Sequence, residues 1–207
     1  MTILFELSNL WNPETIIVYG GLALLLTIIY IENGLFFGFL LPGDSLLFIA
    51  GLLCESSLQL SVWTLIALLI IVAFLGSATG YYSGRLAKNY FKNRKENFFY
   101  KKKYMEVAQV FFDRHGMKAF ILGRFLPVIR TFIPILAGMI DMDAKKFMFF
   151  NFLGLIIWIG SLVLLGHWMG NVFPNLIDYI ELVVIGLVVV TAIPVVLTWT
   201  KNRNLLV

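Results

Sequence analysis

Two arginines lie in an apolar stretch of the chain that also contains two prolines. Within residues 123–138, Arg124 and Arg130 stand six positions apart, and Pro127 and Pro134 follow them closely. A guanidinium is a planar fork of N–H donors that matches a carboxylate or a phosphate, and a charged residue inside a membrane segment is by default a functional-site hypothesis. The pair therefore predicts a site that holds an anionic group.

The two prolines determine how the backbone presents these charges. Each proline lacks a backbone N–H, and its ring clashes with the preceding turn, so we expect the helix to break near Pro127 and near Pro134. Broken backbone at membrane depth occurs only where protein buries it or where it lines a wet cavity. Residues 117–140 are therefore predicted to form a re-entrant hairpin. The alternative is a broken helix whose arginines extend to the lipid headgroups.

Two carboxylates accompany a second turn between short apolar segments. Glu32 closes the first apolar run, and Asp44 follows the turn dipeptide Pro42-Gly43. A helical segment of about ten residues rises only about 15 Å, half of the hydrocarbon core, so the segments on either side of this turn are too short to span. Residues 32–55 are therefore predicted to form a first re-entrant hairpin. The alternative is an aqueous turn between two helices, because Pro-Gly is a common turn signal.

The composition places these segments in a membrane protein. The chain is 60% hydrophobic and 14% charged, whereas soluble domains average about 25% charged residues. We expect one integral membrane domain, residues 1–207, of all-α polytopic fold. Full membrane helices, which need about 20 residues each, are predicted at residues 14–31, 60–84, 147–170 and 177–200.

The basic residues are concentrated in one segment. Eight of the sixteen Lys and Arg residues fall within residues 85–103. The positive-inside rule places this segment in the cytoplasm, and we expect no nucleic-acid partner. Residues 85–116 are predicted to be a basic cytoplasmic segment that includes an amphipathic surface helix. Counting crossings then places the C-terminus inside and brings the two hairpins in from opposite faces.

Each predicted hairpin is followed by a full span, which predicts an inverted repeat with a binding site near the membrane midplane. In the span at residues 60–84, Gly76, Gly80 and Gly84 recur at four-residue spacing and share one helix face. Small residues at this spacing let another helix approach closely. This face suits a homodimer contact and an internal contact equally well.

These segments together resemble the DedA family, bacterial relatives of the VTT (SNARE-associated) domain proteins. The resemblance covers about residues 30–170. It implies a transporter similar to undecaprenyl phosphate translocases, with roles in cell-envelope integrity and membrane-potential homeostasis. It also implies that the family needs the charges at Glu32, Asp44, Arg124 and Arg130. The matching segments are Glu32 with Pro42-Gly43-Asp44, Gly76-x3-Gly80-Tyr81-x2-Gly84-Arg85, Gly123-Arg124-Phe125-x-Pro127-x2-Arg130-Thr131-x2-Pro134-x2-Ala137-Gly138, and Asn151-x2-Gly154-x3-Trp158.

The residues and the resemblance agree on a flippase in the bacterial cytoplasmic (inner) membrane that moves a polyprenyl phosphate for carrier-lipid recycling. We expect Arg124 and Arg130 to bind the lipid phosphate through charge-assisted hydrogen bonds. Glu32 and Asp44 are expected to pair with the arginines when no lipid is bound, and one of them is expected to carry a proton in proton-coupled transport.

Two other transport functions and one enzymatic function compete with this interpretation. One alternative is a proton-coupled exporter of small cations or drugs, in which Glu32 and Asp44 bind the substrate, and another is a general phospholipid scramblase. A lone arginine in the site favours an anionic lipid, and a lone carboxylate favours a cation. An enzyme acting on lipid phosphates is not expected, because His115 and His167 occur in unrelated settings. We expect no metal and no cofactor, since no metal-ligand spacing occurs.

Overall fold

The computed structural model describes residues 13–35, 37–38, 41–55, 58–91, 120–121, 123–125 and 127–173. Within these ranges every regular element is helical, which confirms the all-α prediction for the described part of the chain. Residues 92–116 of the predicted basic segment, with its amphipathic helix and His115, lie outside the described residues, as does the predicted span at residues 177–200. Residues 85–91, predicted to belong to that segment, instead continue the preceding long helix to Phe91. The elements are α2 (Pro13–Gly34), α3 (Gly43–Leu52), α4 (Val62–Phe91), the 3₁₀ turn η2 (Gly123–Phe125), α7 (Pro127–Met139) and α8 (Ala144–Val172).

Two of these helices are long and apolar enough to cross a membrane. They are Val62–Lys88 within α4 and the whole of α8, with a mean hydropathy of 2.3 in the most apolar part of each. The helices α3 and α7 contain 10 and 13 residues. At 1.5 Å per residue these two are about 15 and 20 Å long, shorter than a hydrocarbon core of about 30 Å.

Local sequence signals set the ends of these helices. Asp143 caps α8, since its side chain accepts a hydrogen bond from the backbone N–H of Lys146 at 2.9 Å. Pro127 opens α7, a position where the missing N–H costs nothing. Pro42 directly precedes α3, and Asp44 lies in the first turn of that helix, where a carboxylate interacts favourably with the helix dipole.

The expected helix break at Pro134 is not observed. Pro134 lies inside α7, which continues to Met139, so it is not a hairpin turn. A proline here removes the hydrogen bond to the carbonyl group of Arg130, four residues earlier. Pro134 is buried, and its Cβ lies 3.1 Å from the position that a Cβ would take on Gly80 of α4. The close packing of α7 on α4 therefore offsets the missing bond.

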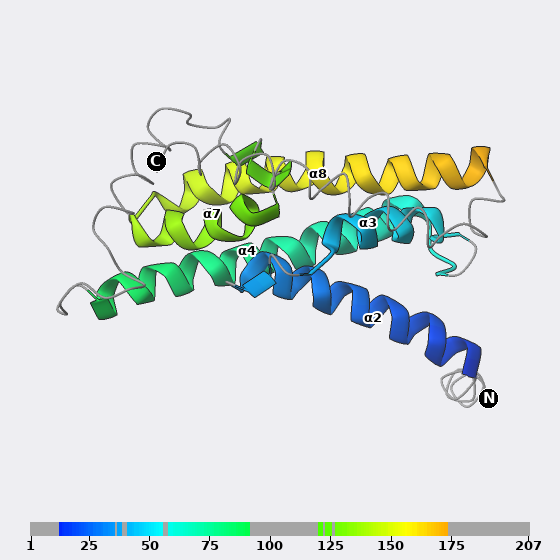
Figure 1. The fold of residues 1–207 in the computed structure, drawn as a ribbon, viewed down its shortest axis with the longest axis horizontal. Coiled ribbons are helices and arrows are strands. Elements are labelled where there is room, and N and C mark those ends of the chain that lie inside the picture. The colour runs from blue at the N-terminus through cyan, green and yellow to red at the C-terminus, as the bar shows by residue number, and fades with distance from the viewer. Residues whose placement is uncertain are drawn as a thin grey trace, which may run out of the picture.

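The two short helices pack on the two long ones in a crossed arrangement. The helix α3 precedes α4 in the chain but packs along α8, and α7 precedes α8 but packs along α4. Figure 1 shows α7 beside the C-terminal part of α4, and α2 extending away from the other helices toward the N-terminus. The helix α2 also packs on α4. Residues far apart in the sequence are thereby brought to the centre of the molecule.

Glycines permit both crossed contacts. Between α3 and α8, a Cβ on Gly51 would overlap the carbonyl oxygen of Val163, and a Cβ on Gly166 would overlap that of Phe48. Each helix thus offers a glycine to the backbone of the other. Any larger residue here would force the helices apart, so close approach explains these glycines.

The contact between α4 and α7 has the same design. A Cβ on Gly84 would overlap the carbonyl oxygen of Ile135, and a Cβ on Gly138 would overlap that of Tyr81. One turn of α4 away from Gly80, a Cβ on Gly76 would lie 2.6 Å from the carbonyl oxygen of Tyr30 in α2. The glycine face of α4 therefore makes internal contacts, with α2 and with α7.

Candidate functional site

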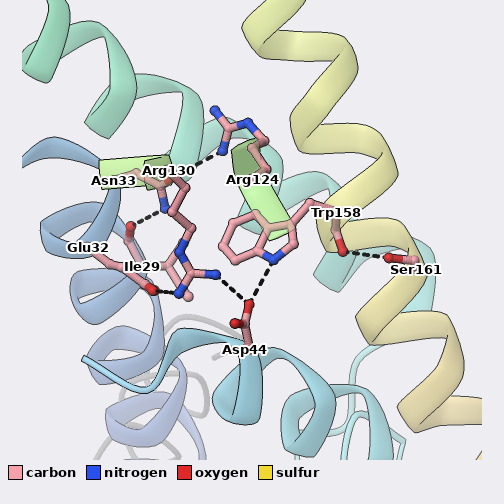
Figure 2. A network of polar contacts seen from close by, with 8 residues as sticks. All are labelled: Ile29, Glu32, Asn33, Asp44, Arg124, Arg130, Trp158 and Ser161. Carbon is pink, nitrogen blue, oxygen red and sulfur yellow. Dashed lines mark hydrogen bonds and ion pairs between the residues drawn. The ribbon is translucent and has the colours of Figure 1, made fainter. Parts of the chain in front are cut away.

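Arg130 joins three helices at the centre of the molecule. It lies in the first turn of α7 and is 3% exposed. Its guanidinium donates hydrogen bonds to Asp44 in the first turn of α3 and to Glu32 in the last turn of α2, and it forms an ion pair with each (Figure 2). The side chain of Glu32 is fully buried, and that of Asp44 is 14% exposed. Removing one member of such a buried group costs about 3–5 kcal/mol, because an uncompensated charge remains.

Arg124 lies close by and has a different set of partners. It belongs to the 3₁₀ turn η2 and is 4% exposed. Its guanidinium donates to three neutral oxygens, which belong to Asn33 of α2 (3.1 Å), Ser77 of α4 (3.3 Å) and Asn151 of α8. Among the described residues, no carboxylate oxygen lies within 4.0 Å of it. Within the described part of the chain, its charge is therefore solvated by dipoles and no counter-ion contacts it.

The acceptor groups around Arg124 are oriented by their own helices. The amide of Asn33 donates to the carbonyl oxygen of Ile29 at 2.9 Å, which turns its Oδ1 toward the guanidinium. The hydroxyl of Ser77 donates to the carbonyl oxygen of Ala73 at 2.9 Å, which leaves its lone pairs to accept from Arg124. Both acceptors are thereby held in place before any ligand arrives.

Trp158 of α8 connects the two arginines. Its indole ring centroid is 4.6 Å from Cζ of Arg130 and 5.9 Å from Cζ of Arg124, within the range of cation–π attraction. Its Nε1 donates a 2.8 Å hydrogen bond to Oδ1 of Asp44 (Figure 2). The indole is 1% exposed. A single aromatic side chain therefore contacts both cations and one of the carboxylates.

Two glycines make room for the charged side chains. A Cβ on Gly154 would lie 3.0 Å from Cδ and 3.1 Å from Nε of Arg124. A Cβ on Gly43 would overlap the carboxylate of Glu32. Oε2 of that carboxylate makes no hydrogen bond of good geometry within the described part of the chain. The site therefore depends on glycine where α3 begins and where α8 passes η2.

The structure brings three of the four predicted charged residues into direct contact. Glu32, Asp44 and Arg130 form one ion-paired group, and Arg124 lies apart from it, linked through Asn33, the neighbour of Glu32, and through Trp158. The sequence interpretation did not predict that the two arginines would have such different partners.

Sequence reasoning assigned no site role to the neutral members of the site, Asn33, Ser77, Asn151 and Trp158, and it noted Asn151 and Trp158 only as part of a matching segment. Asn151 and Trp158 are seven positions apart in an apolar helix, which places both on one face of α8. Polar side chains on the buried face of a membrane helix were the available signal. His167 does not belong to this site, and its Nδ1 lies 3.5 Å from Sγ of Cys54.

Comparisons with known proteins identify the class to which this fold and site belong. Residues 41–168 match the VTT domain. The chain is 36% identical to protein DedA of Escherichia coli K12 over 88% of this chain and 83% of that protein. It is 32% identical to the inner membrane protein YqjA of the same strain, over 80% of this chain and 74% of the relative. An uncharacterized membrane protein of Mycobacterium leprae is 36% identical over 93% of this chain and 86% of its own length.

These matches confirm the resemblance seen in the sequence. The chain is a VTT-domain membrane protein, and it belongs to the DedA family. No solved structure matches it.

Proposed function

We propose that this protein is a flippase that moves a polyprenyl phosphate, such as undecaprenyl phosphate, across the bacterial cytoplasmic membrane for carrier-lipid recycling. The observation that carries the proposal is the setting of Arg124. A buried guanidinium that contacts only neutral acceptors among the described residues attracts an anion that can replace them. The headgroup moves without any covalent step.

The arrangement of the helices supports an inverted repeat of two re-entrant hairpins, residues 32–55 and 117–140. One half contains α3 followed by α4, and the other contains α7 followed by α8. The short helix of each half packs on the long helix of the other half. Glycines serve both contacts in the same way. In transporters built from inverted repeats, interrupted helices at the repeat interface form the binding site near the midplane. The charged cluster lies where α2, α3, α7 and η2 end or begin, as this architecture requires.

The balance of charges supports coupling to protons. With both carboxylates ionised, Glu32, Asp44 and Arg130 carry one net negative charge, which Arg124 balances. One proton on either carboxylate leaves these four residues, Arg124 included, with one net positive charge. This charge matches a singly charged phosphate. Asp44 is the more exposed of the two carboxylates and is therefore the expected entry point for the proton. A proton and the phosphate then bind together, and the phosphate takes over part of the hydrogen bonding of Arg130.

A cation exporter is less well supported by the same contacts. Each carboxylate oxygen that bonds to Arg130 would have to release it before binding a substrate cation. Arg124 would then add repulsion close to that site.

We orient the protein with residues 85–103 and the C-terminus in the cytoplasm, from the positive-inside rule.

The proposal is tested in liposomes that contain radiolabelled polyprenyl phosphate. A soluble phosphatase added outside reaches only the outer leaflet, so protein-catalysed transfer increases the released phosphate. We expect the wild-type protein and the variant Lys145→Gln, which changes an exposed lysine at the start of α8, to catalyse transfer. Arg124→Gln should not. Equal transfer by Arg124→Gln and wild type, with equal insertion, would refute the proposal. Equal transfer of phosphatidylglycerol by the wild type would identify a general scramblase instead.

A further inference from the structure

An apolar groove lies between the two long helices α4 and α8. Its volume is about 400 Å³, in the range of ligand-binding clefts. Apolar side chains line it, among them Ile71 and Leu75 of α4 and Phe149 of α8, which are 56%, 53% and 58% exposed. The groove therefore opens at the surface of the two helices that are suited to cross the membrane.

The groove and two of the three acceptors of Arg124 share the seam between α4 and α8. Phe74 lines the groove, and Ser77, one turn further along α4, accepts a hydrogen bond from Arg124. On α8, Phe152 lines the groove, and its neighbour Asn151 also accepts from Arg124. The outward side of the seam is thus apolar and its inward side is polar.

Two aromatic rings meet across this seam. Phe74 and Phe152 pack edge to face, with ring centroids 6.1 Å apart and planes at 89°. Each ring comes from a different helix and lies within one turn of an acceptor of Arg124. These two rings therefore lie where the lining of the groove comes nearest along each helix to an acceptor of Arg124.

An unpartnered donor lies at the same place. Asn151 is 1% exposed, and its Nδ2 has no hydrogen-bond partner within the described part of the chain. Buried donors are almost always paired, so an N–H group without a partner beside a buried guanidinium is suited to an anionic oxygen. Arg124 and Asn151 together offer a phosphate both charge and a free donor.

We propose that this groove holds the isoprenoid tail of the carried lipid while its phosphate reaches Arg124 and Asn151 through the seam between Phe74 and Phe152. The inference rests on the proposed function. An amphipathic lipid contacts both sides of the seam at once, with its tail on the apolar side and its phosphate on the polar side. A further helix of this chain or a second copy would satisfy only the apolar side.

The test uses the full-length protein in liposomes with polyprenyl phosphate that carries a diazirine in its last isoprene unit. After illumination, mass spectrometry should locate the label on the groove segments of α4 and α8. Labelling confined to other surfaces, such as that of Leu24 in α2, which is 62% exposed, would overturn the inference.

A pair of variants separates this inference from the proposed function. The double variant Leu75→Trp/Phe149→Trp fills the groove, and we expect it to lower transfer by about tenfold, as for a bulky side chain that competes with the tail. The control Leu164→Trp changes an exposed residue of α8 outside the groove and should leave transfer unchanged. If Arg124→Gln abolishes transfer but the filled groove does not lower it, the groove inference fails and the function stands. If the filled groove changes only the oligomeric state in native mass spectrometry, the groove is a contact between copies and the inference also fails.

Discussion

Arg130 and Arg124 are buried to nearly the same extent, 3% and 4% exposed, yet their surroundings differ in charge. Two carboxylates bind Arg130, and three neutral oxygens bind Arg124. Because neutral dipoles stabilise a cation without cancelling it, Arg124 keeps an attraction for anions that the carboxylates take from Arg130. Two identical side chains six residues apart are thereby suited to different roles.

The difference also separates stability from binding. Arg130 holds α2, α3 and α7 together through its ion pairs, so its removal affects the fold first. Among the described residues only neutral groups accept hydrogen bonds from Arg124, so its removal leaves unpaired dipoles but breaks no ion pair. We expect variants of the two arginines to diverge when stability and transfer are measured separately.

The largest effect is expected for Arg130→Gln. It leaves two carboxylates buried next to each other, and the cost should be about 3–5 kcal/mol of unfolding free energy. The destabilisation should shrink at acidic pH, because protonation removes the repulsion between Glu32 and Asp44. Thermal unfolding in detergent at neutral and acidic pH measures both effects. A further Glu32→Gln change should restore part of the stability, and no restoration would show that the ion pairs are not the cause.

A smaller loss of stability is expected for Arg124→Gln, together with loss of transfer. The amide of the new glutamine offers two donors to the three acceptors, so about one oxygen is left unsatisfied, at a cost of about 1–3 kcal/mol. Phosphate transfer in liposomes and unfolding in detergent should be measured on the same preparation. Arg124→Lys keeps the charge but loses the planar set of N–H donors of the guanidinium, so it should recover only part of the transfer. A pH-dependent stability loss like that of Arg130→Gln would contradict the distinction between the two sites.

Trp158→Phe tests the link between the two arginines. It keeps an aromatic ring near both guanidinium groups but removes the hydrogen bond from Nε1 to Asp44. A hydrogen bond to a charged group contributes about 1.5–3 kcal/mol, and we expect a loss near the lower end because Asp44 keeps Arg130. Transfer should fall as well, because Asp44 is then held less firmly beside Arg130. Unfolding in detergent and transfer in liposomes measure the two effects, and unchanged values of both would show that this hydrogen bond does not position Asp44.

The smallest effect is expected for Ser77→Ala. The 3.3 Å hydrogen bond from Arg124 is longer than its bond to Asn33, so we expect it to contribute less than the roughly 1.5–3 kcal/mol typical of hydrogen bonds to charged groups. We expect a small loss of stability and a modest change in the lipid concentration needed for half-maximal transfer. Ser83→Ala is the matched control, because it removes an exposed hydroxyl of the same helix that bonds to the carbonyl oxygen of Gly80 in that helix. Equal effects of both changes would show that the hydrogen bond from Arg124 to Ser77 contributes nothing specific.

The predictions that came directly from sequence concerned class and composition. Long apolar runs and a low charge content indicated an all-α membrane protein. Backbone N–H and C=O groups find no partner in lipid, and a helix pairs all of them within one apolar segment. Glu32, Asp44, Arg124 and Arg130 were identified as site residues because charges are costly in such surroundings. Glycine spacing predicted close packing on α4, and the close contacts at Gly76, Gly80 and Gly84 are found there.

Only the tertiary structure decided which of these groups meet. Arg130 is 86 positions from Asp44 and 98 from Glu32, and their contact depends on α3 packing along α8 while α7 packs along α4. Hydropathy and helical periodicity describe each segment alone, so they carry no information on such crossed packing or on whether a carboxylate or an amide faces a given arginine. The continuation of α7 through Pro134 has the same origin, since packing on α4 outweighs a local preference.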